Sequence, residues 1–172
     1  FAVCTQTITQ MDTTPPVIDC PSDVTIDCNA STDTSNTGTA TAVDACNGYS
    51  IGYTDVLSGD SCTGYITRTW TATDDCGNES SCEQLITIVD DTPPVITCPA
   101  NIEIDCLDDD QPANTGSATA TDDCNTFTIT HDDVTTPGGC PAESTITRTW
   151  TATDTCGNVS SCVQTITVVD IT

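Results

Sequence analysis

The chain has 172 residues and a formal net charge of −24, from 26 acidic side chains against two basic ones. Because binding to a phosphate backbone requires Lys and Arg, this balance excludes nucleic acid as a partner, and it also argues against anionic membrane surfaces. No run of about 18 or more apolar residues occurs, so we expect no membrane insertion. Threonine, at roughly a fifth of the chain, favours strands over helices.

The thirteen cysteines follow a strict spacing. This usage is typical of disulfide bonds formed in an oxidising compartment, which predicts an extracellular or cell-surface location. Zinc is the alternative, but the cysteines form no Cys-x₂-Cys pairs and His131 is the single histidine.

The cysteines also reveal an internal repeat. Cys20 recurs as Cys98, a shift of 78 (98 − 20), and Trp70 recurs as Trp150, a shift of 80 (150 − 70). Because Cys4-Thr5-Gln6-Thr7-Ile8-Thr9 matches the end of both repeats, we interpret residues 1–12 as the last strand of a preceding repeat. Two domains then follow, at 13–91 and 92–172.

Each repeat opens with a Pro-Pro pair, Pro15-Pro16 or Pro93-Pro94, which we expect to act as a stiff hinge. In the first repeat, short strands are predicted at 17–20 and 24–28, followed by a polar loop around residues 36–38. Further strands are predicted up to Val43, over 49–54, around Trp70 and over 82–89, with a loop at 57–60. No helical periodicity is found, so the fold class is all-β, with six or seven strands in each β-sandwich.

The strand around Trp70 recurs almost unchanged around Trp150. Its residues alternate between an outward row of threonines and an inward row that includes Arg68, and Arg148 takes the same place in the second repeat. These two residues are the only basic side chains of the chain. We expect each guanidinium to lie along the neighbouring Trp and reach a carboxylate; a ligand-binding arginine is the alternative.

Strand geometry narrows the disulfide pairing. At about 3.3 Å per residue, Cys62 and Cys76 lie roughly 30–45 Å apart, whereas a disulfide needs Cα atoms within about 7 Å. Each of the two therefore pairs at its own end of the domain. The predicted bonds are Cys20–Cys82, Cys28–Cys62 and Cys46–Cys76, and in the second repeat Cys98–Cys162, Cys106–Cys140 and Cys124–Cys156.

Cys4 remains as the thirteenth cysteine. We expect it to bond either a preceding repeat or a neighbouring subunit.

Aspartates gather where each domain meets its linker. Carboxylates this close repel one another unless they are protonated or bridged by a hard cation such as Ca²⁺. An interdomain Ca²⁺ is one interpretation; a solvated acidic turn without metal is the other, and no cofactor is required. The candidate ligands are Asp12, Asp44, Asp74, Asp75, Asp90, Asp91, Asp122, Asp123 and Asp154.

Three Asn-x-Ser sequons begin at Asn29, Asn78 and Asn158, all in predicted loops, so these asparagines are candidate glycosylation sites. The outward threonines could instead carry O-linked sugar. Paired carboxylates could also serve a glycosidase, but here they lie in turns of a small repeated domain. With no nucleophilic triad either, we expect no enzyme activity.

Three further stretches, 93–102, 120–124 and 149–158, resemble hyalin-repeat (HYR) domains. The cysteine-rich version is similar to the tandem repeats of very large bacterial surface proteins, including type IX-secreted ones. The resemblance implies immunoglobulin-like or fibronectin-III-like sandwiches, exported and used for adhesion or surface structure, without catalytic residues. The family's cysteine set is looser than six per repeat, so it does not supply the pairing.

The resulting hypothesis is a structural tandem-repeat segment of an extracellular fibre or filament, whose partners are copies of itself or flanking repeats. The alternative is an adhesin that recognises a glycan or a cell-surface partner. A third interpretation is an accessory domain of an enzyme.

Overall fold

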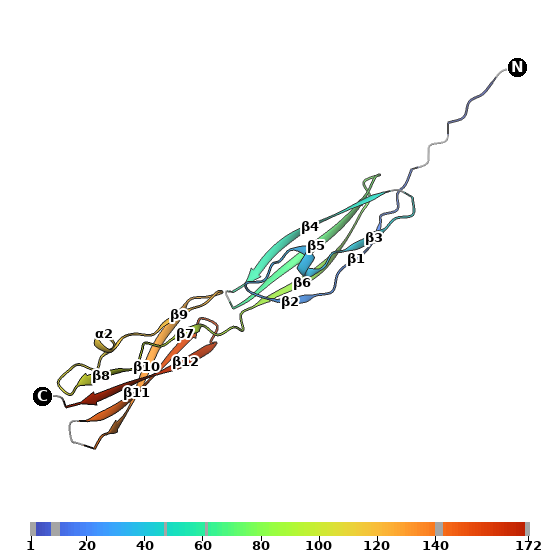
Figure 1. Ribbon diagram of the computed structural model, residues 1–172. Coiled ribbons are helices and arrows are strands. Elements are labelled where there is room, and N and C mark those ends of the chain that lie inside the picture. Colours follow the sequence, from blue (N-terminus) through green and yellow to red (C-terminus); the bar gives the residue numbers. More distant parts are fainter. Residues whose placement is uncertain (1–2, 8–10, 47, 61, 140–142, 171–172) are drawn as a thin grey trace. The chain divides into compact units, whose positions relative to one another are not determined.

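The computed structural model describes residues 3–7, 11–46, 48–60, 62–139 and 143–170. It divides into two compact units, unit 1 over Phe1–Val89 and unit 2 over Asp90–Thr172 (Figure 1). Unit 1 contains β1 (Val17–Asp19), β2 (Val24–Asp27), α1 (Thr34–Thr37), β3 (Thr41–Val43), β4 (Tyr49–Gly59), β5 (Thr63–Asp74) and β6 (Glu79–Val89). Unit 2 contains β7 (Val95–Thr97), β8 (Ile102–Asp105), α2 (Pro112–Thr115), β9 (Thr119–Thr121), β10 (Phe127–Pro137), β11 (Ser144–Asp154) and β12 (Val159–Val169).

Both units use the same two sheets. In unit 1 a four-stranded sheet has the order β2-β6-β5-β4, and a two-stranded sheet pairs β1 with β3. β2 runs parallel to β6, and the other neighbours are antiparallel. β1 contacts β5 and β6, so the small sheet lies against one face of the large one. Unit 2 repeats this with β8-β12-β11-β10 and β7-β9, and the predicted all-β, disulfide-rich sandwich is confirmed.

The alternation along β5 places the core. Ile66, Arg68, Trp70 and Ala72 are buried, while the threonines between them are partly exposed. Ile66 packs with Ile26 and Ile86, and in unit 2 Ile146 packs with Ile104 and Ile166. Such a core is small for a unit of about 80 residues, so covalent and polar links must add to its stability.

Three expectations about local structure need correction. The polar loop around residues 36–38 contains α1, a single helical turn, and α2 repeats it in unit 2. Residues 57–59 belong to β4 rather than to a loop, because β5 is long enough to pair with them up to Gly59. The second proline of each pair, Pro16 or Pro94, is buried within its unit, so it is part of the packing and not only of a hinge.

Candidate functional site

The guanidinium of Arg68 makes four hydrogen bonds within unit 1. Arg68 is 1% exposed, and its Nε and Nη2 donate to the two carboxylate oxygens of Asp55 at 2.8 Å each. Nη1 donates to Oγ1 of Thr37 and Nη2 to the carbonyl oxygen of Thr32, both at 2.8 Å. The guanidinium carbon lies 4.3 Å from the ring centre of Tyr53 and 5.9 Å from that of Trp70. The predicted carboxylate and Trp contacts are therefore present, and the guanidinium has no room for a ligand.

Arg148 repeats this arrangement in unit 2. It is fully buried, with Nε and Nη2 on the carboxylate of Asp133 at 2.8 and 2.7 Å. Nη1 donates to Oγ1 of Thr115 at 2.8 Å, and Nη2 donates to the carbonyl of Asp110 at 2.9 Å. The hydrogen bonds with Asp133 raise the pKa of Arg148, and those with Arg148 lower the pKa of Asp133. Both groups are therefore held in their charged forms.

A buried glutamine in each unit adds hydrogen bonds beside those of the arginine. This residue was not predicted from the sequence. Gln84 is fully buried; its amide donates to the carbonyls of Ser22 and Thr37 at 3.0 and 2.6 Å, and its Oε1 accepts from Trp70 Nε1 at 3.4 Å. Gln164 makes the corresponding contacts in unit 2. Together Arg68, Asp55, Thr37, Gln84 and Trp70 form what we call the arginine clamp, and Arg148, Asp133, Thr115, Gln164 and Trp150 form its copy.

The one-turn helix explains how the clamp reaches across the sandwich. Thr37 lies at its end and offers a hydroxyl to Arg68 and a carbonyl to Gln84. Gly38 follows with φ +98, and a Cβ there would lie 2.8 Å from Pro21, so glycine is required for this approach. The sequence signal for this feature was the Asn-Thr-Gly triplet at 36–38, which returns at 114–116.

One disulfide in each unit joins the start of the unit to its last strand. Cys20, directly after β1, bonds Cys82 in β6 with a Cα–Cα distance of 6.0 Å, and Cys98 bonds Cys162 at 5.8 Å. Trp70 is the register partner of Cys82. Each bond therefore covalently links the two sheets beside the clamp.

The cysteines of the other four predicted pairs differ in whether they are disulfide-bonded. Cys28, Cys62, Cys124 and Cys156 are each disulfide-bonded. Cys46 has a free, exposed thiol, so the expected Cys46–Cys76 bond is absent and that prediction is wrong for this structure. Cys106 is also a thiol, so Cys106–Cys140 is not formed; Cys140 lies outside the described residues. Cys4 carries an exposed thiol.

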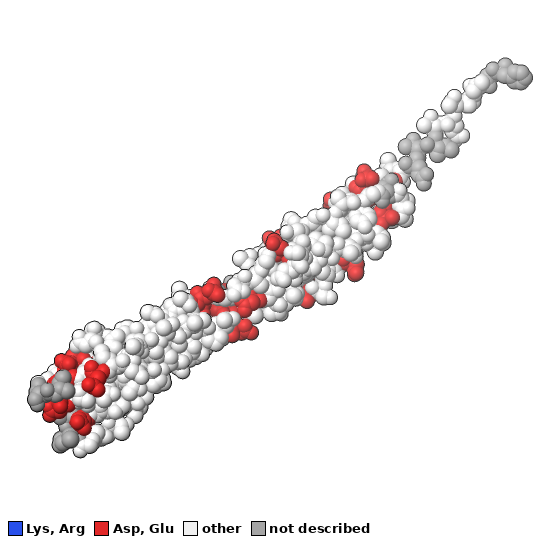
Figure 2. All heavy atoms as spheres, in the orientation of Figure 1, with Lys and Arg blue, Asp and Glu red and all other residues white. Residues whose placement is uncertain are grey.

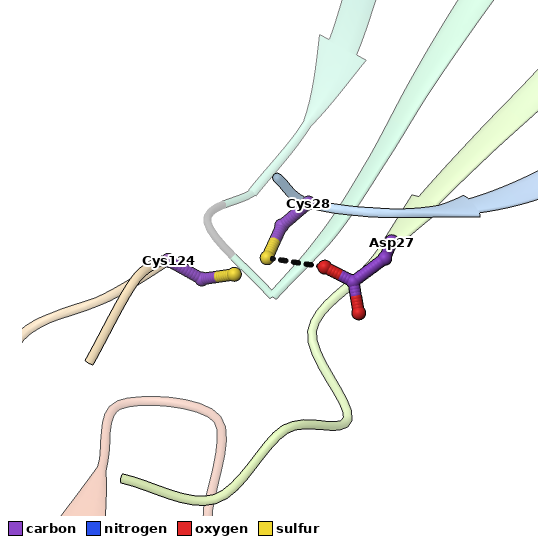
Figure 3. A group of neighbouring side chains, drawn as sticks. All are labelled: Asp27, Cys28 and Cys124. Carbon is purple, nitrogen blue, oxygen red and sulfur yellow. Dashed lines mark hydrogen bonds between the residues drawn. The ribbon is translucent and has the colours of Figure 1, made fainter. Parts of the chain in front are cut away.

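Nearby carboxylates affect the sulfur atoms at both places. Asp12, followed by burial and Asp44, raises the pKa of the Cys46 thiol, and burial, followed by Asp105, raises that of Cys106. Figure 3 shows Cys28, the unit 1 counterpart of Cys106, with its Sγ 3.2 Å from Oδ1 of Asp27. Because Cys28 is disulfide-bonded, this is a close sulfur–oxygen contact without a proton.

Three of the predicted metal ligands come together in unit 1. Asp12, Asp44 and Asp74 each offer a carboxylate oxygen within 4.8 Å of the others, and we call this group the acidic cluster. Asp74 is 5% exposed, and its carboxylate accepts from the amide of Asn78 and from the backbone N–H groups of Cys76 and Asn78. The side-chain bond from Asn78, followed by these backbone bonds, lowers the pKa of Asp74 and keeps it ionised.

The equivalent aspartates of unit 2 behave differently. The carboxylate of Asp90 accepts a short hydrogen bond from the amide of Asn125, and Asp122 accepts from the backbone N–H of Asn125 at 2.6 Å. Asp154 keeps the Asn158 contacts. Burial raises the pKa of Asp154, but the hydrogen bonds from Asn158, Cys156 and Gly157 together outweigh it, so the pKa is lowered. Within the described ranges, Asp90, Asp122 and Asp154 do not form a three-carboxylate group, and neither do Asp75, Asp91 and Asp123.

The acidic cluster fits a hard cation only in part. Ca²⁺ takes about six to eight oxygen ligands, so three carboxylates would have to be completed by carbonyl groups or water. Its chemistry there would be to neutralise repulsion among the three aspartates. In unit 2 the Asn125 amide already occupies Asp90.

The sequon asparagines are not equally accessible. Asn29 is exposed in the turn after β2. The amide nitrogen of Asn78 donates to Asp74 and to the carbonyl of Asp12, and that of Asn158 donates to Asp154 and to the carbonyl of Asp90. A sugar on Asn78 or Asn158 would replace one of the amide hydrogens that make these bonds.

The surface shown in Figure 2 displays acidic atoms and no basic ones, because both arginines are buried. One partly open hollow of about 280 Å³ lies beside Asp44 in unit 1, lined also by Thr14, Pro15, Val17, Val43 and Ala45. It is at or below the small end of the size range of small-molecule sites. Among the residues that the structure describes, no helix is both long enough and apolar enough to cross a membrane.

Comparison with known proteins gives one family match. Residues 94–168 match the family described as "HYR-like domain with 4 cysteines". Unit 2 is HYR-like. It has six cysteines, two more than this description, and four of them, Cys98, Cys124, Cys156 and Cys162, are disulfide-bonded. Among curated proteins, none matches the chain.

Three solved structures illustrate the structural similarity. Drosophila N-cadherin EC1-4 has 14% identity and a TM-score of 0.46, with 91% of this chain and 50% of that chain covered. Human mucin-like protocadherin EC1-2 has 8% identity and a TM-score of 0.36, with 90% and 98% covered. Protocadherin gamma B7 EC1-4 has 16% identity and a TM-score of 0.34, with 91% of this chain and 51% of that chain covered. The chain thus spans about half of the N-cadherin and gamma B7 fragments, and at these scores their functions do not transfer to it.

Proposed function

We propose that this chain is a structural tandem-repeat segment, stiffened by its disulfides, of an extracellular surface fibre or filament within a bacterial surface or type IX-secreted protein. The observation that carries the proposal is the position of the Cys20–Cys82 and Cys98–Cys162 bonds. They have sequence separations of 62 and 64, so each encloses most of its unit. Force applied along the chain then passes through the sulfur–sulfur bond and bypasses the strands between the two cysteines.

The arginine clamp supports the same role. It ties the edge strand β4, the strand β5 and the turn α1 together through four short hydrogen bonds of one guanidinium. Charge-assisted hydrogen bonds of this length are among the stronger polar contacts in proteins. The part of each unit inside the disulfide loop is therefore fixed by polar contacts as well as by a small apolar core. This structural role includes no catalytic step.

Single-molecule stretching of the chain tests the proposal. With the disulfides intact, we expect the residues enclosed by each bond to stay unextended. The variant Cys20→Ser/Cys82→Ser should release additional length from unit 1, up to about 200 Å at about 3.3–3.6 Å per residue. The residues still held by the disulfides of Cys28 and Cys62 reduce this length. Unit 2 is the matched control and should be unchanged. Extension of the enclosed residues in the unaltered protein, or a variant that releases no more length than the unaltered protein, would contradict a mechanical role for these bonds.

We further propose that the acidic cluster of unit 1 binds Ca²⁺ and thereby fixes the segment that enters the unit. The motivation is the convergence of three carboxylates, one of them from residue 12 ahead of β1. Calcium should raise the unfolding temperature of unit 1, and Asp12→Asn should remove that effect. Asp132→Asn, a matched change on exposed β10, should leave it intact. Identical melting of unit 1 in calcium and in chelator would exclude the site.

For N-glycosylation, we propose Asn29 ahead of Asn78 and Asn158, because the amides of the latter two are engaged in hydrogen bonds. Mass spectrometry of peptides from the native fibre would test this order. Sugar on Asn78 and not on Asn29 would contradict it.

A further inference from the structure

The outer edge of the four-stranded sheet in unit 1 is a long strand. β4 ends the order β2-β6-β5-β4, and among the described residues β5 is its only sheet neighbour (Figure 1). It has 11 residues, against four for β2 at the opposite edge. An edge strand presents a row of backbone N–H and C=O groups that a further strand can pair with.

This edge is close to electrically neutral although the chain carries a net charge of −24. The one charged residue of β4 is Asp55, and both of its carboxylate oxygens accept from Arg68. Because two copies of a polyanion repel each other least where their charge is locally balanced, β4 is favoured as a place for self-association.

Exposed apolar side chains lie on both faces of the strand. Val56 is 64% exposed on the outer face, and Tyr53 and Leu57 are 46% and 72% exposed on the inner face. Proteins commonly protect a long edge with lysine, proline, a bulge or an inward-pointing charge. The one inward-pointing charge of β4 is Asp55, which is paired with Arg68 and is not left unbalanced at the edge. β4 contains no lysine or proline, and its charge is balanced.

Unit 2 carries this protection. β10 is the corresponding edge, with His131 opposite Trp150 as Tyr53 is opposite Trp70. In this alignment Asp132 takes the place of Thr54 and Pro137 that of Gly59. The charge of Asp133 is balanced by Arg148. The charge of Asp132 is additional, and it places an exposed carboxylate in the middle of the strand.

We propose that β4 pairs with β4 of a second copy of this chain, antiparallel, about a two-fold axis at Thr54. In this register Thr54 faces its symmetry mate, a favourable cross-strand pair. Val56 faces Gly52, where no atom lies within 4 Å of the missing Cβ, and Leu57 faces Ile51. Asp55 faces Tyr53, which keeps the two Asp55 carboxylates from lying directly opposite each other.

Sedimentation equilibrium of the full chain tests the pairing. The wild type should dimerise in a concentration-dependent way, and more strongly at about 0.5 M than at 0.15 M salt, because salt screens the repulsion between the two chains. Thr54→Asp should weaken the dimer by about tenfold or more, because it places like charges opposite each other. The fold should tolerate this change, since β10 carries aspartate at the same place, and circular dichroism checks it.

Thr69→Asp is the matched control. Thr69 is the register partner of Thr54 on β5, so Thr69→Asp adds the same charge on the strand next to the edge strand. It should dimerise within a few-fold of wild type. Slowed hydrogen exchange of the amides of residues 49–59 on dimerisation would locate the interface. A wild type that stays monomeric in high salt, a Thr54→Asp dimer as strong as wild type, or equal weakening by both variants would overturn the proposal.

Discussion

The two units share their interior and differ at their ends and edges. Arg68 and Arg148 make the same four hydrogen bonds, and Gln84 and Gln164 make the same three. At the acidic end, by contrast, Asp12 joins two other carboxylates, whereas its counterpart Asp90 is bound by Asn125. The fold therefore requires the clamp and the sheet-joining disulfide, whereas the turns and edges can take different roles in each unit.

The largest test of the shared interior is to remove the sheet-joining disulfide from one unit at a time. Cys20→Ser/Cys82→Ser and Cys98→Ser/Cys162→Ser should each lower the free energy of unfolding of their own unit by about 4 kcal/mol, from the chain entropy of a loop of this length. Because the loops have separations of 62 and 64, the two losses should be nearly equal. Denaturant unfolding followed by tryptophan fluorescence measures both, since each unit has one Trp. A clear loss of stability from one variant and none from the other would contradict an equal role of the two bonds.

The next effect comes from the clamp. Arg68→Met and Arg148→Met should each destabilise their unit by about 3 kcal/mol, near the low end for breaking a buried ion pair, because Asp55 and Asp133 are 33% and 30% exposed and regain water. Arg68 also lies on Tyr53, so its loss should be the slightly larger one. Chemical denaturation of both variants, with Asp132→Asn as a surface control, gives the values. A change within the error of the control would contradict a structural role.

Low pH should reduce the stability of unit 2, because the carboxylate of Asp133 becomes protonated. Its pKa is lowered from the ordinary 3.8, chiefly by the hydrogen bonds from Arg148, so the stabilisation is fully present above that value and is lost as the pH falls through the lower folded value. Asp133→Asn should therefore cost stability at pH 7, and the difference from wild type should narrow below about pH 4. Urea unfolding across this range measures it. A difference that does not change with pH would show that the carboxylate charge is not responsible.

The smallest effect concerns the thiol of Cys46. The negative charge of Asp12 is the main cause of the raised pKa of this thiol. Asp12→Asn should lower that pKa and speed alkylation of Cys46 at neutral pH a few-fold, because the thiolate is the reactive form. Mass spectrometry of the labelled peptide follows the rate, with Cys4 as the internal control. An unchanged ratio of the two rates would rule out control by Asp12.

The repeat, the all-β class and the structural role of the two arginines could be predicted from the sequence alone. Strict alternation around Trp70 and Trp150 placed Arg68 and Arg148 inside, and a buried cation must find a carboxylate. These inferences follow from the two-residue period of a strand, which the sequence displays directly.

Tertiary structure decided which distant groups meet. Asp55 and Asp133 as the arginine partners depend on the register of β4 with β5 and β10 with β11, and the Thr37 and Gln84 contacts depend on one helical turn too short to leave a periodic pattern. The same holds for Asn125, whose hydrogen bond to Asp90 makes the aspartates of unit 2 differ from the acidic cluster of unit 1. Local pattern fixes which way a side chain points, whereas its partner is fixed by packing between segments that are far apart along the chain.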